Sequence, residues 1–62
     1  MYTSKAEAIV SYAAENAEEI DFTKGDMILV DETSIADGYI FGQVNGKAGY
    51  LKLRCIRILG KG

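Results

Sequence analysis

The chain of 62 residues contains no histidine, no proline and no tryptophan, and its single cysteine is Cys55. One cysteine cannot form a disulfide within the chain, and the usual ligands of a structural zinc ion are missing. A catalytic thiol needs a neighbouring base, so we interpret Cys55 as a small, semi-buried apolar residue. We therefore expect no metal, no cofactor and no enzymatic activity. A free thiol also fits a reducing compartment, which predicts a cytoplasmic protein.

Strong charge of one sign is also absent, because seven Lys and Arg stand against nine Asp and Glu, for a net charge of −2. Nucleic-acid binding depends on clustered cations, so we do not expect it. No apolar run is long enough to span a membrane, and no signal-peptide pattern is present. A chain of this length forms one domain that buries only about 60% of its unfolded surface. We expect a monomer in isolation, cut from a larger multidomain protein, whose stability depends on one small core.

Alternation of apolar and polar residues predicts five short strands, at 6–12, 27–33, 39–44, 47–51 and 55–59. Residues 19–22 alternate in the same way, with Ile20 and Phe22 on one side and Glu19 and Asp21 on the other. Gly42 lies inside a predicted strand, which indicates close packing or a bulge. The alternation predicts these core residues: Ala6, Ala8, Ile20, Phe22, Ile28, Val30, Leu51 and Ile56.

The connections between these strands carry turn signals. Residues 23–26 and 34–38 are predicted turns or loops, and 52–54 a single tight turn. Asn45-Gly46 predicts a type I′ hairpin, because both central residues of that turn need positive φ. The acidic segment 13–19 contains good helix formers but lacks a wide apolar stripe, so we interpret it as a loop. The pattern as a whole predicts a small antiparallel barrel or sandwich.

Six segments, in this order and spacing, resemble the SH3 (Src-homology-3) domain. They are AIVSY (8–12), EEIDF (18–22), KGDMILV (24–30), Gly38-Tyr39-Ile40, Asn45-Gly46 with Gly49, and GYLKLRCI (49–56). The resemblance implies an all-β, five-stranded antiparallel barrel of two packed sheets, with a short 3-10 turn before the last strand. It places the RT loop at 13–21, the n-Src loop at about 32–37 and the distal hairpin at 45–46. The domain would span 6–59, between flexible ends at 1–5 and 60–62.

The resemblance also implies a binding surface. SH3 domains hold proline-rich helices across aromatic grooves and take a flanking Arg or Lys into an acidic pocket. Three of the groove positions are tyrosines in this chain, and three others depart from the family pattern. The implied peptide-binding residues are Tyr12, Tyr39 and Tyr50, with Val10, Lys52 and Cys55 at the altered positions. The implied acidic pocket consists of Glu15, Glu18, Glu19 and Asp37.

Our first hypothesis is a non-catalytic peptide-binding module in a signalling, cytoskeletal or membrane-traffic protein. Its ligand would be a proline-rich segment or an atypical one containing Arg or Lys. The alternative is an intramolecular or homotypic structural contact without a free polyproline ligand. The altered groove positions favour that alternative, and an apolar patch of Leu51, Leu53 and Ile58 would serve it, although Leu51 is also a predicted core residue. A third hypothesis, an acidic ligand on Lys47, Lys52, Arg54 and Arg57, is disfavoured by the negative net charge.

Overall fold

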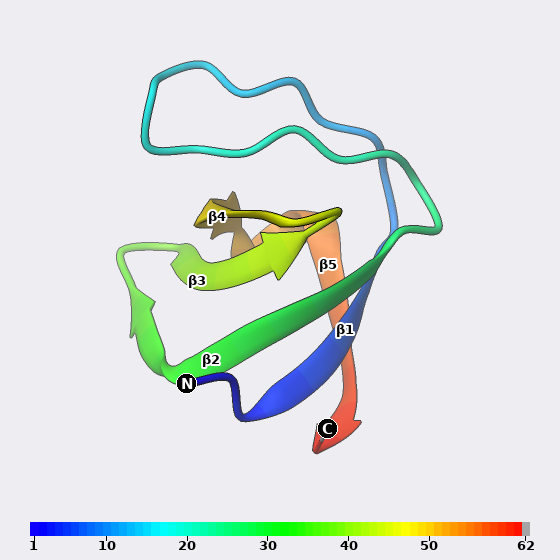
Figure 1. Cartoon of the computed structure of the whole chain (residues 1–62), viewed down its shortest axis with the longest axis vertical. Coiled ribbons are helices and arrows are strands. Elements are labelled where there is room, and N and C mark those ends of the chain that lie inside the picture. Colours follow the sequence, from blue (N-terminus) through cyan, green and yellow to red (C-terminus); the bar gives the residue numbers. More distant parts are fainter. Residues whose placement is uncertain (62) are drawn as a thin grey trace.

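The computed structural model describes residues 1–61 and is built from five strands and one short 3-10 helix (Figure 1). The strands are β1 (Ser4–Ala8), β2 (Met27–Ala36), β3 (Tyr39–Val44), β4 (Lys47–Lys52) and β5 (Ile56–Lys61). The 3-10 helix η1 (Leu53–Cys55) connects β4 to β5. The predicted all-β class and the tight turn before the last strand are confirmed.

All neighbouring strands pair antiparallel, in the order β4-β3-β2-β1-β5. Hydrogen bonds connect all five strands, so the two packed sheets implied by the resemblance are parts of one continuous sheet. The sheet is curled, since Leu51 of the edge strand β4 and Ile56 of the opposite edge strand β5 belong to the same core cluster. The barrel is therefore closed by side-chain packing across its interior.

One apolar core fills the interior of this sheet. All eight predicted core residues are buried, and Leu51, Val30 and Ala6 have no exposed surface. Three further buried residues, Ile40, Val44 and Cys55, complete the cluster. Cys55 is only 5% exposed, because η1 turns it inward between β4 and β5, so it lies deeper than the semi-buried position expected for it. The thiol is free.

Two of the predicted backbone features have a clear structural reason. A β-carbon on Gly42 would lie 2.7 Å from the carbonyl oxygen of Leu29 and 2.8 Å from Leu51 Cδ1, so close packing explains this glycine. Asn45 and Gly46 have φ angles of 52° and 82°, as the predicted type I′ hairpin requires. Both residues connect β3 to β4.

The ends of the first and last strands differ from the expected boundaries. β1 begins at Ser4, which is 1% exposed, and β5 continues to Lys61. Residues 4–5 and 60–61, expected in flexible ends, therefore pair in the sheet. Gly62, also assigned to a flexible end, lies outside the described residues. The predicted strand 6–12 ends early at Ala8, because the chain then bends toward η1 and the Ile9 amide donates to the Cys55 carbonyl over 2.9 Å.

The predicted loop at 34–38 is shorter in the structure. β2 continues to Ala36, and only Asp37 and Gly38 form the turn to β3. The register shifts between Asp31 and Ala36. There the Ser34 hydroxyl donates to the Asp31 carbonyl within β2 and accepts the Phe41 amide of β3. Residues 32–36, assigned to the n-Src loop, are thus irregular strand rather than free loop.

Candidate functional site

The segment from Ile9 to Asp26 forms a long loop that doubles back on itself (Figure 1). It extends beyond the expected RT loop, 13–21, on both sides, and from here on the name RT loop means the whole segment. Tyr12 and Phe22 pair as an isolated antiparallel bridge, with N···O distances of 2.9 and 3.0 Å. Their rings stack with centroids 5.6 Å apart. This pairing closes the base of the loop and confirms that 13–19 is an excursion without helix.

The far part of the RT loop is fastened to β4. The Tyr50 amide donates to the Glu18 carbonyl over 2.8 Å, and the Ile20 amide donates to the Tyr50 carbonyl over 3.3 Å. A β-carbon on Gly49 would lie 2.8 Å from Ile20 Cγ2 and 2.9 Å from the Glu18 oxygen. The missing side chain at Gly49 therefore lets the loop approach the strand and fixes the position of the acidic residues beside Tyr50.

Glu19 is the one buried carboxylate of the RT loop, with 6% of its surface exposed. Its Oε1 accepts the Tyr12 hydroxyl and the Glu15 amide, each over 2.9 Å. Its Oε2 is also buried, and within residues 1–61 it has no hydrogen-bond partner. The alternation of residues 19–22 placed Glu19 on the side opposite Ile20 and Phe22 and gave no sign of its burial, which arises because the loop folds this side chain back against the Tyr12 hydroxyl.

These contacts change the acidity of three side chains. The hydrogen bond from the Glu15 amide, with help from Tyr12, holds the pKa of Glu19 below its ordinary value despite burial. Burial and the hydrogen bond to Glu19 raise the pKa of Tyr12. The Glu19 carboxylate also raises the pKa of Tyr39. Glu19 is thus an anion at neutral pH, surrounded by two neutral phenols.

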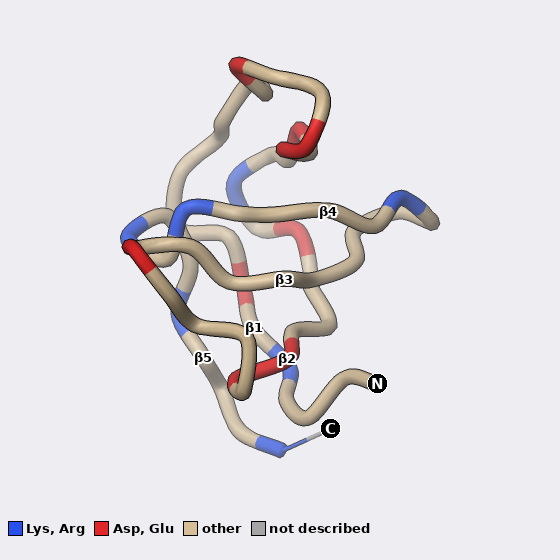
Figure 2. The backbone as a smooth tube through the Cα atoms, turned by 90° about the vertical axis from the view of Figure 1, so that its left-hand side faces the viewer, with Lys and Arg blue, Asp and Glu red and all other residues tan. Residues whose placement is uncertain are grey.

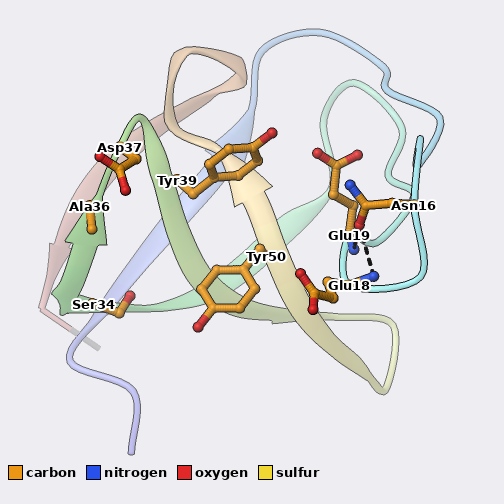
Figure 3. A pocket seen from close by; sticks show the side chains of 8 residues that line it. All are labelled: Asn16, Glu18, Glu19, Ser34, Ala36, Asp37, Tyr39 and Tyr50. Carbon is orange, nitrogen blue, oxygen red and sulfur yellow. Dashed lines mark hydrogen bonds between the residues drawn. The ribbon is translucent and has the colours of Figure 1, made fainter.

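An open depression of about 530 Å³ lies between the RT loop and the turn from β2 to β3 (Figure 3). Glu18, Glu19 and Asn16 line it from the RT loop, and Ser34, Ala36 and Asp37 from the opposite side. The rings of Tyr39 and Tyr50 lie between the two groups. We call this hollow the acidic depression. Aromatic faces with carboxylates beside them suit a side chain that has an aliphatic stem and a cationic end.

A second depression of about 440 Å³ lies on the other side of Tyr39 and is lined by Asp37, Gly38, Tyr39, Lys52, Leu53 and Arg54. The Leu53 amide donates to the Gly38 carbonyl over 2.9 Å, which connects η1 to the β2–β3 turn. We call it the Arg54 depression. Tyr39 and Asp37 belong to both depressions and form the wall between them.

The structure brings together five of the ten residues predicted for the site. Glu18, Glu19, Asp37, Tyr39 and Tyr50 share the acidic depression. Glu15 lies apart from it, with its Oε1 3.6 Å from Lys52 Nζ. That Lys52 nitrogen also lies 5.3 Å from the centre of the Tyr12 ring. The lysine at the expected proline position therefore covers the ring that a proline would otherwise contact.

Two predicted groove residues do not form a groove surface. Cys55 is part of the core, as described above, so its side chain is withdrawn from the binding face. Val10 is 46% exposed but lines neither depression, because β1 ends two residues earlier. The half of the family groove that these positions would form is therefore changed in shape as well as in sequence.

Three residues of the acidic depression, Asn16, Ser34 and Ala36, were missed by the sequence reasoning. Asn16 Oδ1 accepts the Glu18 amide over 2.9 Å and so shapes the tip of the RT loop (Figure 3). The Ser34 hydroxyl accepts the Phe41 amide over 2.8 Å. Asn in a loop is a recognised turn former, so Asn16 carried a usable signal. Nothing local to Ser34 indicates that it bonds to a strand seven residues away.

Charge is distributed unevenly over the backbone (Figure 2). Acidic residues gather in the RT loop, whereas basic residues lie at both ends of β4. Outside the depressions, Arg57 on β5 pairs with Glu7 on β1 over 2.8 Å. Residues 1–61 contain no group of three or more side chains placed to hold a metal ion, and no helix long and apolar enough to cross a membrane.

The protein is a small five-stranded antiparallel β-barrel. Its long first loop folds onto β4 and brings acidic residues beside two tyrosines. The family model of the variant SH3 domain matches residues 5–59. The chain belongs to the SH3 family, whose members are non-catalytic modules that bind peptides.

Solved structures agree with this assignment. The SH3 domain of Acanthamoeba myosin I, bound to Acan125, is 27% identical, with a TM-score of 0.84 over 95% of this chain and all of that one. The C-terminal SH3 domain of myosin IB from Entamoeba histolytica is 25% identical, with a TM-score of 0.83 over 95% of this chain and 97% of that one. The same domain is also solved with a peptide, EhFP10(GEF).

The first SH3 domain of human Rho GTPase-activating protein 10 is 30% identical, with a TM-score of 0.80 over 94% of this chain and 83% of that one. A search of curated protein sequences found no match.

Proposed function

We propose that this domain binds short peptide segments that carry an arginine or lysine, and that the basic residue enters the acidic depression. One observation carries the proposal. Glu19 is buried, ionised and has one carboxylate oxygen without a partner among residues 1–61, at the wall of a hollow beside Tyr39. A buried charge with an open acceptor is costly unless something satisfies it. A cationic ligand group would do so.

A proline-rich helix is the weaker part of the ligand in this proposal. The ring of Tyr12 is covered by Lys52, and Cys55 is withdrawn into the core. A proline that packs on Tyr12 would have to displace the lysine from both the ring and Glu15. We therefore propose that proline-rich segments bind only when they also carry a basic residue for the acidic depression.

The similar domains support a proposal about the cellular setting. Two of them belong to class I myosins and one to a GTPase-activating protein, and two of the solved structures contain a bound partner. We propose that this domain acts in a cytoskeletal or signalling protein of the cytoplasm and is a monomer by itself.

The test is a titration with two synthetic peptides that differ in one residue. Each has an alanine and proline background, and one carries an arginine where the other carries its uncharged isostere citrulline. The arginine peptide should shift the amide signals of Glu18, Glu19 and Tyr39, and Glu19→Gln should abolish its advantage. Glu7→Gln is the matched control, since it removes one carboxylate that lies outside both depressions and pairs with Arg57. Equal binding of the two peptides would refute the proposal.

A structural contact without a free peptide is the second candidate. Met27 is 57% exposed and Leu29 39% exposed on neighbouring outward positions of β2, beside a shallow hollow that Lys5 also lines. The apolar patch expected from the sequence, Leu51 with Leu53 and Ile58, does not form a surface of this kind. Leu51 is fully buried, and Leu53 and Ile58 are partly buried against the core. Sedimentation at increasing concentration separates the candidates: self-association that Leu29→Ser abolishes supports the contact, and a monomer at every concentration excludes the homotypic form.

A further inference from the structure

The two depressions that meet at Tyr39 have opposite electrostatic character. Glu18 and Glu19 line the acidic depression, whereas the cations Lys52 and Arg54 line the Arg54 depression. A single ring and a single acidic residue, Asp37, separate them. An extended peptide that crosses Tyr39 would therefore contact carboxylates before the ring and cations after it.

The two cations of the Arg54 depression are not equivalent. Lys52 already contacts Glu15 and the Tyr12 ring. The ion pairs formed within residues 1–61 are Lys52 with Glu15 and Arg57 with Glu7, so Arg54 takes part in neither. Arg54 is exposed in the middle of the η1 turn. Its charge lowers the pKa of Tyr39 slightly, against the larger effect of Glu19, which raises it. Its five N–H donors suit a carboxylate bound through both oxygens.

The remaining lining of the Arg54 depression is consistent with a ligand chain that passes over it. Leu53 is partly buried against the core and Gly38 presents backbone only, so the floor is apolar or flat. Asp37 is the one acidic side chain among the lining residues. Asp37 lies in the wall shared by the two depressions. Its charge favours binding of a cation in the acidic depression and weakens binding of an anion in the Arg54 depression.

We infer that the preferred ligand is a dipolar peptide, with a basic residue in the acidic depression and a glutamate or aspartate in the Arg54 depression. The inference rests on the proposed function, because it assigns a second subsite to the same peptide. The carboxylate accepts hydrogen bonds from Arg54, and the order of the two charges along the peptide fixes its direction across Tyr39. Exposed charge pairs contribute little individually, so the carboxylate strengthens binding by about two- to fivefold.

The experiment uses synthetic alanine and proline peptides with one Arg and one Glu at increasing separations, in both orders. The matched peptides replace Glu with Gln, or Arg with citrulline. At one separation and in one order, the Arg–Glu peptide should bind about two- to fivefold more tightly than its Gln partner at low salt. Added NaCl should remove the difference, because screening acts on exposed charges.

Two charge-reversed variants assign the effect. Arg54→Glu should remove the preference for Glu and favour a peptide with Lys at that position. Lys47→Glu makes the same change of charge at the opposite end of β4, outside both depressions, and should keep the preference. Melting curves of both variants check that each is folded.

The outcomes separate the two proposals. If the Arg–Gln peptide binds better than its citrulline partner but Glu adds nothing at any separation, the inference fails and the proposed function stands. If arginine itself makes no difference, the proposed function fails. A preference for Glu that survives Arg54→Glu also overturns the inference, because the carboxylate then binds elsewhere.

Discussion

Gly49→Ala tests whether the RT loop is held in place by its contact with β4. The new β-carbon would lie 2.8 Å from Ile20 Cγ2 and 2.9 Å from the Glu18 carbonyl oxygen, distances at which one side must move. Overpacking of this kind costs about 1–3 kcal/mol. Replacing glycine also stabilises the folded state by about 0.4–1 kcal/mol, through the smaller entropy of the unfolded chain. The expected net loss is therefore about 0.5–2 kcal/mol in the free energy of unfolding.

Thermal and urea denaturation measure this loss, which should lower the melting temperature by about 4–8 °C per kcal/mol in a domain of this size. Amide signals of Glu18 and Tyr50 should shift, because the alanine separates the RT loop from β4, which the hydrogen bond between these two residues connects. Ala48→Ser is the control, an exposed neighbour whose substitution should change stability by less than about 0.5 kcal/mol. A Gly49→Ala protein with unchanged stability and unchanged Glu18 and Tyr50 signals would contradict the packing argument.

Two further predictions concern the binding surface. Lys52→Pro should strengthen binding of a proline-rich peptide by about two- to fivefold, because the ligand no longer displaces a cation from the Tyr12 ring. The φ angle of Lys52, −73°, already suits proline. A fluorescence titration that shows no gain in affinity would mean that Tyr12 is not a proline contact. Because the folded-state pKa of Glu19 is depressed, its contribution to stability is complete above the unfolded pKa of about 4.3 and is lost as the pH falls through the folded pKa. Acid unfolding curves should show this loss of stability. Glu19→Gln should flatten the curve, and Tyr12→Phe, which removes a hydrogen bond to the carboxylate, should move the loss to higher pH. Identical curves for the two variants and the unchanged protein would refute the assignment of this pH dependence to Glu19.

The strands and most of the core followed from local patterns. Alternation identified Ala6, Ile28 and Leu51 as core because these positions face one interior. The hairpin at Asn45-Gly46 and the close packing at Gly42 were also predictable, since each depends on one residue type with a known geometric need. The order of motifs along the chain then supplied the fold that the strands alone left open between barrel and sandwich.

Contacts between distant segments limited the prediction of the site. Glu19 is buried because the RT loop folds back on Tyr12, and the alternation of residues 19–22 contains no sign of this. Lys52 covers Tyr12 although forty residues of sequence separate them. Cys55 occupies a groove position in the family pattern, but η1 directs it into the core. The family pattern thus predicted which positions belong to the site. It did not predict how the side chains that differ from the family, such as Lys52 and Cys55, are oriented, because their orientation depends on packing.

The most direct test of the central claim is the map of amide shifts during titration with an arginine-containing peptide. The largest changes should fall on Glu18, Glu19, Tyr39 and Tyr50, around the acidic depression, and Glu19→Gln should suppress them. Changes confined to the outer face of β2, at Met27 and Leu29, or the same map with Glu19→Gln as with the unchanged protein, would contradict it.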